Sequence, residues 1–328
     1  MDVSFPGFPA GRILRPLGHF MTRRAIIDVG TNSVKVLLAE VDGHDVTPVW
    51  ETSEQTRLGR GFYETHQLQS SAIQATAAAV ARFAITARER GAESVRVIAT
   101  SAARDAINRL ELLGAIQSIA GLTTEVISGE TEADWAFAGV ASTPGWSADR
   151  ILVLDVGGGS TEFILGAGGH AEFRTSLKLG SVRMLEQLQP GDAPTPDALA
   201  RCRTTLDAFL QREIAPSLGT ALAQGGIPTR TVGVGGSTAL LALIHLGRRE
   251  FDRDLIEATR FTPAELSSLV EKLWSLPIDQ RRQLPGLPPE RADVILTGAA
   301  IYEAILRTFA LPHLGVSLRG LRFAALIH

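Results

Sequence analysis

The chain has 328 residues, enough for two domains of ordinary size, and its 45% hydrophobic and 20% charged residues form a globular composition. The formal net charge of −3 argues against a broad basic face, and therefore against nucleic-acid binding. The single cysteine, Cys202, excludes an intrachain disulfide and a cysteine-based zinc cluster, and suits a cytoplasmic location.

The N-terminal segment does not have the pattern of a signal peptide. Residues 1–20 contain Pro, Gly and Arg but no continuous apolar core, so they do not form a convincing signal peptide. We expect residues 1–22 to be a disordered extension, or else Met21 to be the true start. No apolar run approaches the roughly 20 residues that span a bilayer, so we expect no membrane association.

The first half of the chain alternates strands and helices. Val, Ile and Leu-rich runs predict strands, and Ala-rich stretches with helical spacing predict helices. We expect strands over 24–30, 33–41, part of 44–59, 94–100 and 124–128, and helices over 68–90, 102–119 and 129–141.

The second half repeats this order. The run Thr262-Pro263-Ala264-Glu265 has the pattern of a capping box with proline at the first helical position. We expect a hairpin at 151–167, strands at 171–179, 229–236 and 315–317, and helices from 181, over 196–217, 237–246, 262–276 and 289–310, and at the C-terminus.

The two halves also share a sequence frame. "DVGTNS" begins at Asp28 and "DVGGGS" at Asp155, and in each half the frame lies between two apolar strands. An internal duplication is the simplest explanation. We therefore predict an α/β protein with two similar domains facing each other across a cleft, one over 23–130 and the other over 131–318. The final helix, about 319–328, is expected to pack back on the first.

Three glycine-containing loops are candidate phosphate sites. Glycine permits positive φ and close approach, so the backbone amides of such a loop can point at an anion. In the third loop a strand is followed directly by a helix N-terminus, which also favours anions. The candidate phosphate-binding residues are Gly30, Thr31, Asn32, Ser33, Gly157, Gly158, Gly159, Ser160, Thr161, Gly235, Gly236 and Ser237.

Carboxylates stand beside these loops. Asp28 and Asp155 end strands next to the first two loops, where an acid would repel phosphate unless a cation lay between them. Mg²⁺ prefers a few carboxylates together with waters and phosphate oxygens. We therefore predict a Mg²⁺ (or Mn²⁺) site at Asp155, with Glu162 on the returning strand and Asp28 as further candidates.

The segment "ISGETEADW" places Glu130, Glu132 and Asp134 at the start of a helix between the two domains. Acids in a first turn are ordinary dipole-compensating residues, but one here could also take a proton from an attacking water. Arg104 follows a strand end and is a candidate phosphate clamp. Lys178 is a further candidate, and the weaker ones are Arg183, Arg57 and Arg60.

These residues resemble a known family. The runs "AIIDVGTNSVKVLLAEV", "ATSAARDAIN", "ISGETEA", "LDVGGGSTEFILG", "SLKLGSVRMLE", "VGVGGSTALLAL" and "RADVILTGAAIYEAIL" occur in the order typical of the exopolyphosphatase/guanosine pentaphosphate phosphohydrolase (Ppx/GppA) family, of the actin, sugar kinase and Hsp70 superfamily. The resemblance covers about residues 24 to 322.

The resemblance implies two ribonuclease-H-like, actin-like domains and Mg²⁺-dependent hydrolysis of a terminal phosphoanhydride of polyphosphate or guanosine pentaphosphate. It places the catalytic base on Glu132, with Glu130 as the alternative, and assigns Arg104 to the phosphate-contacting positions. A homodimer is also expected.

Two departures from the family pattern bear on processivity and on the closing contacts of the last helix. The chain resembles the short form without the C-terminal helical domain of long members, which puts processivity on long polymers in doubt. Its "VSLRGLRFAAL" also lacks the Asp and Glu-Gly of the family's final motif. We retain three alternatives to polyphosphate hydrolysis: guanosine pentaphosphate hydrolysis, a binding protein without catalysis, and a sugar kinase.

Overall fold

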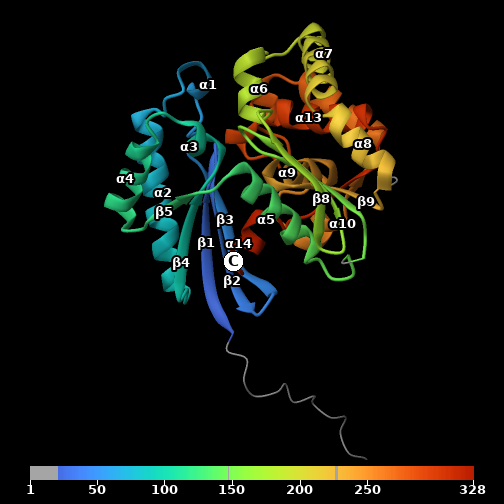
Figure 1. Cartoon of the computed structure of the whole chain (residues 1–328). Helices are drawn as coiled ribbons and strands as arrows, with labels where there is room; N and C mark the ends of the chain where they lie inside the picture. Colours follow the sequence, from blue (N-terminus) through green and yellow to red (C-terminus); the bar gives the residue numbers. More distant parts are fainter. Residues whose placement is uncertain (1–20, 147, 226–227) are drawn as a thin grey trace, which may run out of the picture.

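The computed structural model describes residues 21–146, 148–225 and 228–328. The predicted extension over residues 1–22 lies almost wholly outside this described part. Two β-sheets, each covered by helices, stand side by side, and we call each sheet with its helices a lobe (Figure 1). The mixed α/β architecture with two facing, duplicated units confirms the predicted fold class.

The first lobe is built on a five-stranded sheet of order β3-β2-β1-β4-β5. Strands β1, β2 and β3 form an antiparallel meander, and β4 and β5 continue it in parallel with β1. The strands are β1 (Thr22–Val29), β2 (Ser33–Asp42), β3 (Asp45–Gln55), β4 (Ser94–Ala99) and β5 (Thr124–Val126), and the helices are α1 (Phe62–Thr65), α2 (Ser70–Glu89), α3 (Ser101–Asp105) and α4 (Arg109–Ala120).

The second lobe repeats this topology in a sheet of order β10-β11-β9-β6-β7-β8. Its strands are β6 (Ile151–Val156), β7 (Thr161–Ala167), β8 (His170–Leu177), β9 (Arg230–Val234), β10 (Arg260–Phe261) and β11 (Leu314–Val316). Its helices are α6 (Ser181–Leu188), α7 (Pro196–Glu213), α8 (Ala215–Gly225), α9 (Gly235–Leu246), α10 (Arg253–Ala258), α11 (Pro263–Ser275), α12 (Ile278–Arg281), the 3₁₀ turn η1 (Pro289–Arg291) and α13 (Ile295–Thr308).

Each of two helices between the lobes packs on the sheet from which it is more distant in the chain. Helix α5 (Gly129–Ala141) follows the first sheet in the chain, but Phe137 packs with Val153 of the second sheet. Helix α14 (Leu321–Ala325) comes last, yet Phe323 packs with Ile26 of the first sheet. Where α5 meets the turn before α14, a Cβ on Gly139 would lie 2.2 Å from the Gly320 carbonyl oxygen, so only glycine permits this approach.

Several helix boundaries differ from the prediction. The helix expected over 102–119 is divided into α3 and α4 by extended backbone at Ala106. The one expected over 196–217 is divided at Ile214 into α7 and α8, and the last long helix begins only at Ile295 after a 3₁₀ turn. The capping box is confirmed, because Thr262 and Glu265 exchange both hydrogen bonds. None of the described helices is both long and apolar enough to cross a bilayer.

Candidate active site

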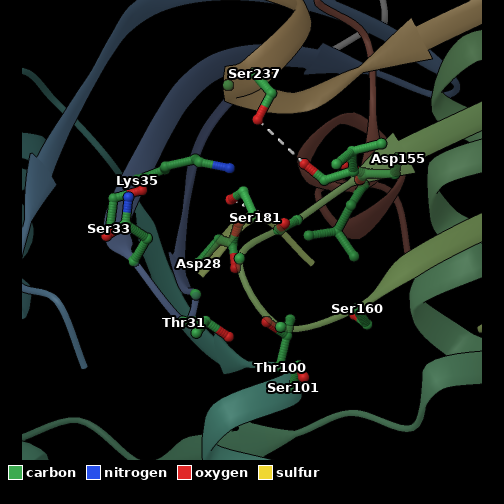
Figure 2. Close-up of a pocket in the computed structure, with 18 of the residues that line it drawn as sticks. Asp28, Thr31, Ser33, Lys35, Thr100, Ser101, Asp155, Ser160, Ser181 and Ser237 are labelled. Atoms are coloured by element: carbon green, nitrogen blue, oxygen red, sulfur yellow. Dashed lines mark hydrogen bonds between the residues drawn. The ribbon is translucent and has the colours of Figure 1, made fainter. Parts of the chain in front are cut away.

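An inner cavity of about 60 Å³ lies between the lobes, where the central strands of both sheets end (Figure 2). Glycine backbone and polar side chains from both lobes form most of its wall. The lining includes Asp28, Gly30, Thr31, Asn32, Ser33, Lys35, Thr100, Ser101, Glu132, Asp155, Gly157, Gly158, Gly159, Ser160, Glu162, Ser181, Gly236, Ser237 and Arg291.

The first two predicted phosphate loops have nearly identical turns. The amide of Gly30 donates to the carbonyl of Ser33 at 3.1 Å, and the amide of Gly157 donates to that of Ser160 at 3.0 Å. In both loops a Cβ on the first glycine would meet this acceptor oxygen at 3.1 to 3.2 Å. The structure therefore brings both loops to one cavity, as the duplication predicts.

Strand register places the hairpin carboxylates in this cavity. Asp155 stands directly opposite Glu162 in the β6–β7 ladder, and Asp28 stands directly opposite Lys35 in the β1–β2 ladder. Directly opposed residues point to the same face of a sheet. Each loop is therefore flanked by a pair of ionisable side chains that line the cavity. Figure 2 shows three of them, Asp28, Lys35 and Asp155.

Burial dominates the electrostatics of these carboxylates. Desolvation raises the pKa of Asp28, Asp155 and Glu162 above their usual values. Repulsion by neighbouring acids adds to the rise at Asp155 and, more strongly, at Glu162. Lys35 opposes the rise at Asp28 and Asp155. The Ser176 hydroxyl donates to Glu162 at 2.7 Å and opposes the rise there. The cations of the cavity therefore do not fully compensate its buried acids, whose pKa values stay raised.

Glu132 reaches the same cavity from helix α5. The helix begins after the capping residue Ser128, whose hydroxyl accepts from the Thr131 amide at 3.0 Å. Arg104 donates to Glu132 Oε2 at 3.0 Å and to the Ile127 carbonyl at 3.1 Å. Burial nevertheless raises the pKa of Glu132 to about 7, while Arg104 lowers it. A carboxyl group with a pKa near neutrality is suited to accept a proton.

The structure separates some predicted residues from the cavity. Glu130 is exposed, Lys178 is exposed, and neither lines the cavity. Thr161 is buried and donates its hydroxyl to the Leu179 carbonyl. Arg104, expected to clamp phosphate, is engaged by Glu132 instead. Gly235 borders only the neighbouring outer pocket.

The structure also adds residues that sequence reasoning missed. Lys35 and Arg291 bring positive charge, and burial lowers the pKa of Arg291 only to about 10, so it stays protonated at neutral pH. Thr100 and Ser101 directly follow β4, as Gly235 and Gly236 directly follow β9, so they extend the internal repeat to a fourth loop between a strand and a helix. This repeat was a signal for Thr100 and Ser101 in the sequence.

A larger outer pocket of about 420 Å³ opens beside the inner cavity. The two share Asp28, Ser33, Lys35, Asp155, Gly236, Arg291 and Leu321. The lining of the outer pocket includes the apolar residues Ala239, Leu240, Leu243, Phe251, Pro288 and Leu318, and Arg322 adds a further cation. An elongated anion could therefore extend from the inner cavity into this pocket.

The residues present could supply some of the ligands of a divalent cation, and the phosphate oxygens of a substrate the others. Asp28 Oδ1 is buried and has no hydrogen-bond partner in the described part of the chain. Within the same described ranges, no three His, Cys, Asp or Glu side chains form a metal cluster by themselves. Mg²⁺ is commonly held by one or two carboxylates together with waters and phosphate oxygens, so this incomplete set matches its preference.

Comparisons with known proteins agree with this geometry. A model of the Ppx/GppA phosphatase family matches residues 36–327. Exopolyphosphatase 2 of Mycobacterium tuberculosis is 32% identical over 299 residues, which are 88% of this chain and 91% of that protein. The guanosine-5'-triphosphate,3'-diphosphate pyrophosphatase of Vibrio atlanticus is 39% identical over 164 residues, 50% of this chain and 33% of that protein.

Solved structures show the same likeness over both lobes. The Ppx-GppA enzyme of Aquifex aeolicus superposes with a TM-score of 0.74 and 28% identity over 94% of this chain and 99% of that one. An exopolyphosphatase-like protein superposes with a TM-score of 0.83 and 27% identity over 93% of this chain and 97% of the other.

Proposed function

Because this chain belongs to the Ppx/GppA phosphatase family and is a phosphoanhydride hydrolase, we propose that it is an exopolyphosphatase. In this reaction the terminal phosphoanhydride bond of inorganic polyphosphate is hydrolysed and orthophosphate is released. The relative in Mycobacterium tuberculosis that is named exopolyphosphatase 2, similar over most of both chains, supports the proposal.

The composition of the inner cavity carries this proposal. The loops at 30–33 and 157–160 supply backbone amides and hydroxyls, and Glu132 lies in the same wall. Donors that are already in place where negative charge develops stabilise phosphoryl transfer without reorganisation. The cavity is small enough to favour a single phosphate group, and the rest of a chain would occupy the outer pocket.

The proposed mechanism uses Glu132 as general base. Its carboxylate accepts a proton from a water molecule while the water oxygen attacks the terminal phosphorus. The bond from that phosphorus to the bridging oxygen breaks, and the electron pair leaves with the shortened chain. Arg104 holds the Glu132 carboxylate in place, and the loop amides bind the non-bridging oxygens.

We further propose that Asp155 and Glu162, with Asp28 beside them, supply one or two of the ligands of Mg²⁺, and that waters and substrate phosphate oxygens would supply the rest. The bound ion would supply positive charge to the phosphate oxygens and to the buried carboxylates. The raised pKa values of these acids and the unpartnered Asp28 Oδ1 support this assignment.

Substitution of the base tests the mechanism. We expect Glu132→Gln to lower kcat by about 100- to 10,000-fold, the range typical of a lost general base, and to leave the dissociation constant for polyphosphate nearly unchanged. Orthophosphate release and calorimetric binding measure the two effects. Release at the wild-type rate would refute the role of Glu132. If the wild-type protein binds polyphosphate tightly but releases no phosphate, a regulatory binding role would replace the catalytic one.

One observation favours guanosine pentaphosphate as a second candidate substrate. The apolar residues that line the outer pocket could accept a nucleobase while the phosphates extend into the inner cavity. We expect Leu240→Asn, which adds polarity without charge, to weaken turnover of guanosine pentaphosphate if the base lies there, and to leave turnover of short polyphosphate near its wild-type value. Phosphate release from both substrates, compared at equal concentration, separates the two functions.

A further inference from the structure

A contact between the lobes lies beyond the residues assigned to catalysis. Helix α1 and the residues before it face helix α6 at one end of the gap between the lobes (Figure 1). The Gly61 amide donates to Glu186 at 2.6 Å, and the Arg183 guanidinium lies over the Tyr63 ring, 3.9 Å from its centre. We call these four residues the interlobe contact.

The interlobe contact is joined directly to the second phosphate loop. Arg183 Nε donates to the Gly159 carbonyl at 3.0 Å. A Cβ on Gly159 would lie 2.5 Å from the Tyr63 hydroxyl, 2.6 Å from that of Ser101 and 2.9 Å from that of Thr31. Three hydroxyl groups therefore fill the space that a side chain on Gly159 would occupy, and those of Ser101 and Thr31 belong to residues that line the inner cavity.

The Tyr63 hydroxyl is buried without a well-formed hydrogen bond in the described structure. Burial raises the pKa of Tyr63 to about 12, so the group is neutral at any ordinary pH. The Tyr63 ring packs against the Arg183 guanidinium and against the Phe62 ring, which meets it edge-on with ring centres 5.2 Å apart. These two contacts hold the Tyr63 side chain next to Gly159.

The inner cavity is open on another side. There it continues into the outer pocket, which is several times larger, carries Lys35, Arg291 and Arg322, and is not lined by Thr31, Ser101 or Gly159. A phosphate chain would therefore have room and positive charge on one side of the terminal phosphate and a filled wall on the other.

We infer that Tyr63, held by Arg183, is a specificity-determining residue that closes the inner cavity behind the terminal phosphate, so that only an unsubstituted chain end is accepted. The inference rests on the proposed function, because it takes a phosphate chain as substrate. It goes further by assigning the selection of chain ends to residues outside the catalytic group.

An end-capped substrate tests this inference. Short linear polyphosphate with free ends is compared with the same chain carrying a phenyl ester on each terminal phosphate. Hydrolysis of a capped end would transfer water to the terminal phosphorus and release phenyl phosphate and a chain shortened by one unit. Phosphorus NMR distinguishes these products from orthophosphate.

We expect the wild-type enzyme to hydrolyse free ends and to leave capped ends intact. Tyr63→Ala should create space for the phenyl group and reduce the preference for free ends at least tenfold in kcat/KM. Tyr63→Phe is the matched control, because it keeps the ring and should keep the preference. Tyr63→Val, with a larger side chain than alanine, serves as a second space-creating variant if Tyr63→Ala does not fold.

Hydrolysis of capped ends by the wild-type enzyme at the rate of free ends would overturn the inference. So would an unchanged preference in folded Tyr63→Ala or Tyr63→Val. The same free-to-capped ratio measured by calorimetric affinity tests the contact without turnover. If the variants lower the free-to-capped affinity ratio but the wild-type enzyme releases no phosphate, the inference is supported and the proposed hydrolysis is contradicted. If the wild-type enzyme releases phosphate but the variants leave the ratio unchanged, the hydrolysis is supported and the inference is contradicted.

Discussion

The β1–β2 hairpin of the first lobe and the β6–β7 hairpin of the second lobe have the same loop geometry but different charge. In each hairpin an aspartate ends the first strand, and one residue of the returning strand stands directly opposite. That residue is Lys35 opposite Asp28, and Glu162 opposite Asp155. The first pair is nearly neutral, whereas the second carries two acids.

This difference in charge suits the two copies of the hairpin to bind different groups. A lysine beside a loop of amides and hydroxyls favours an anion, so the first hairpin is suited to bind phosphate. Two opposed carboxylates repel each other and favour a cation or a proton. Glu132 adds to the repulsion felt by Glu162, which places the proposed base on the acidic side of the cavity.

Of the two hairpins, the larger effect is expected from the acidic pair. Glu162→Gln should lower kcat by about 100- to 1,000-fold, as when one preorganised electrostatic group is removed from an active site. The KM for polyphosphate should change little, because the first hairpin still binds the chain. Steady-state phosphate release at several Mg²⁺ concentrations measures both constants. Wild-type kcat in this variant would show that the two hairpins do not divide the work in this way.

A smaller effect, of another kind, is expected from the basic position. Lys35→Met should raise KM about 10- to 100-fold, since a hydrogen bond to a charged group contributes about 1.5–3 kcal/mol. Lys35→Arg keeps the charge and should recover most of the affinity. If Lys35→Met instead lowers kcat at unchanged KM, then Lys35 acts on the transition state and the contrast between the hairpins fails.

Much of this arrangement could be predicted from the sequence. The repeated frame identified both hairpins, and the antiparallel register that follows from a short loop placed Glu162 beside Asp155. The same register places Lys35 opposite Asp28, at the position equivalent to Glu162 in the second half. The equivalence of the halves was therefore sufficient to find Lys35.

Other features depend on geometry that the sequence does not encode locally. Glu130 and Glu132 are two residues apart on one helix, about 200° around its axis, so only the packing of α5 decides which one faces inward. The partner of Arg104 depends on the same packing. The contact of Tyr63 with Arg183 joins distant segments and forms only because the lobes approach each other.

The pH dependence of activity should shift moderately when Arg104 is replaced. A general base works deprotonated, so kcat/KM should rise with pH through about 7, the pKa of Glu132. Arg104 lowers that pKa, so Arg104→Gln should move the rise to higher pH and cost most activity on the acidic side. Lys178→Gln, at an exposed position outside the cavity, is the control that should not shift the profile. An unshifted profile in Arg104→Gln would mean that another group limits the reaction at low pH.

The smallest effect is expected on stability, and it again distinguishes the hairpins. The folded pKa of Glu162 lies well above its ordinary value of 4.5, so its contribution to stability is fully present below that pH and is lost as pH rises. Glu162→Gln removes this cost and should raise the melting temperature of the metal-free protein by a few degrees at pH 8, with little change at pH 5. Asp28→Asn should give a smaller increase, because Asp28 loses a favourable interaction with Lys35. Thermal melts at the two pH values measure both variants, and an equal gain from each would show that the opposite residue does not determine the cost of the buried acid.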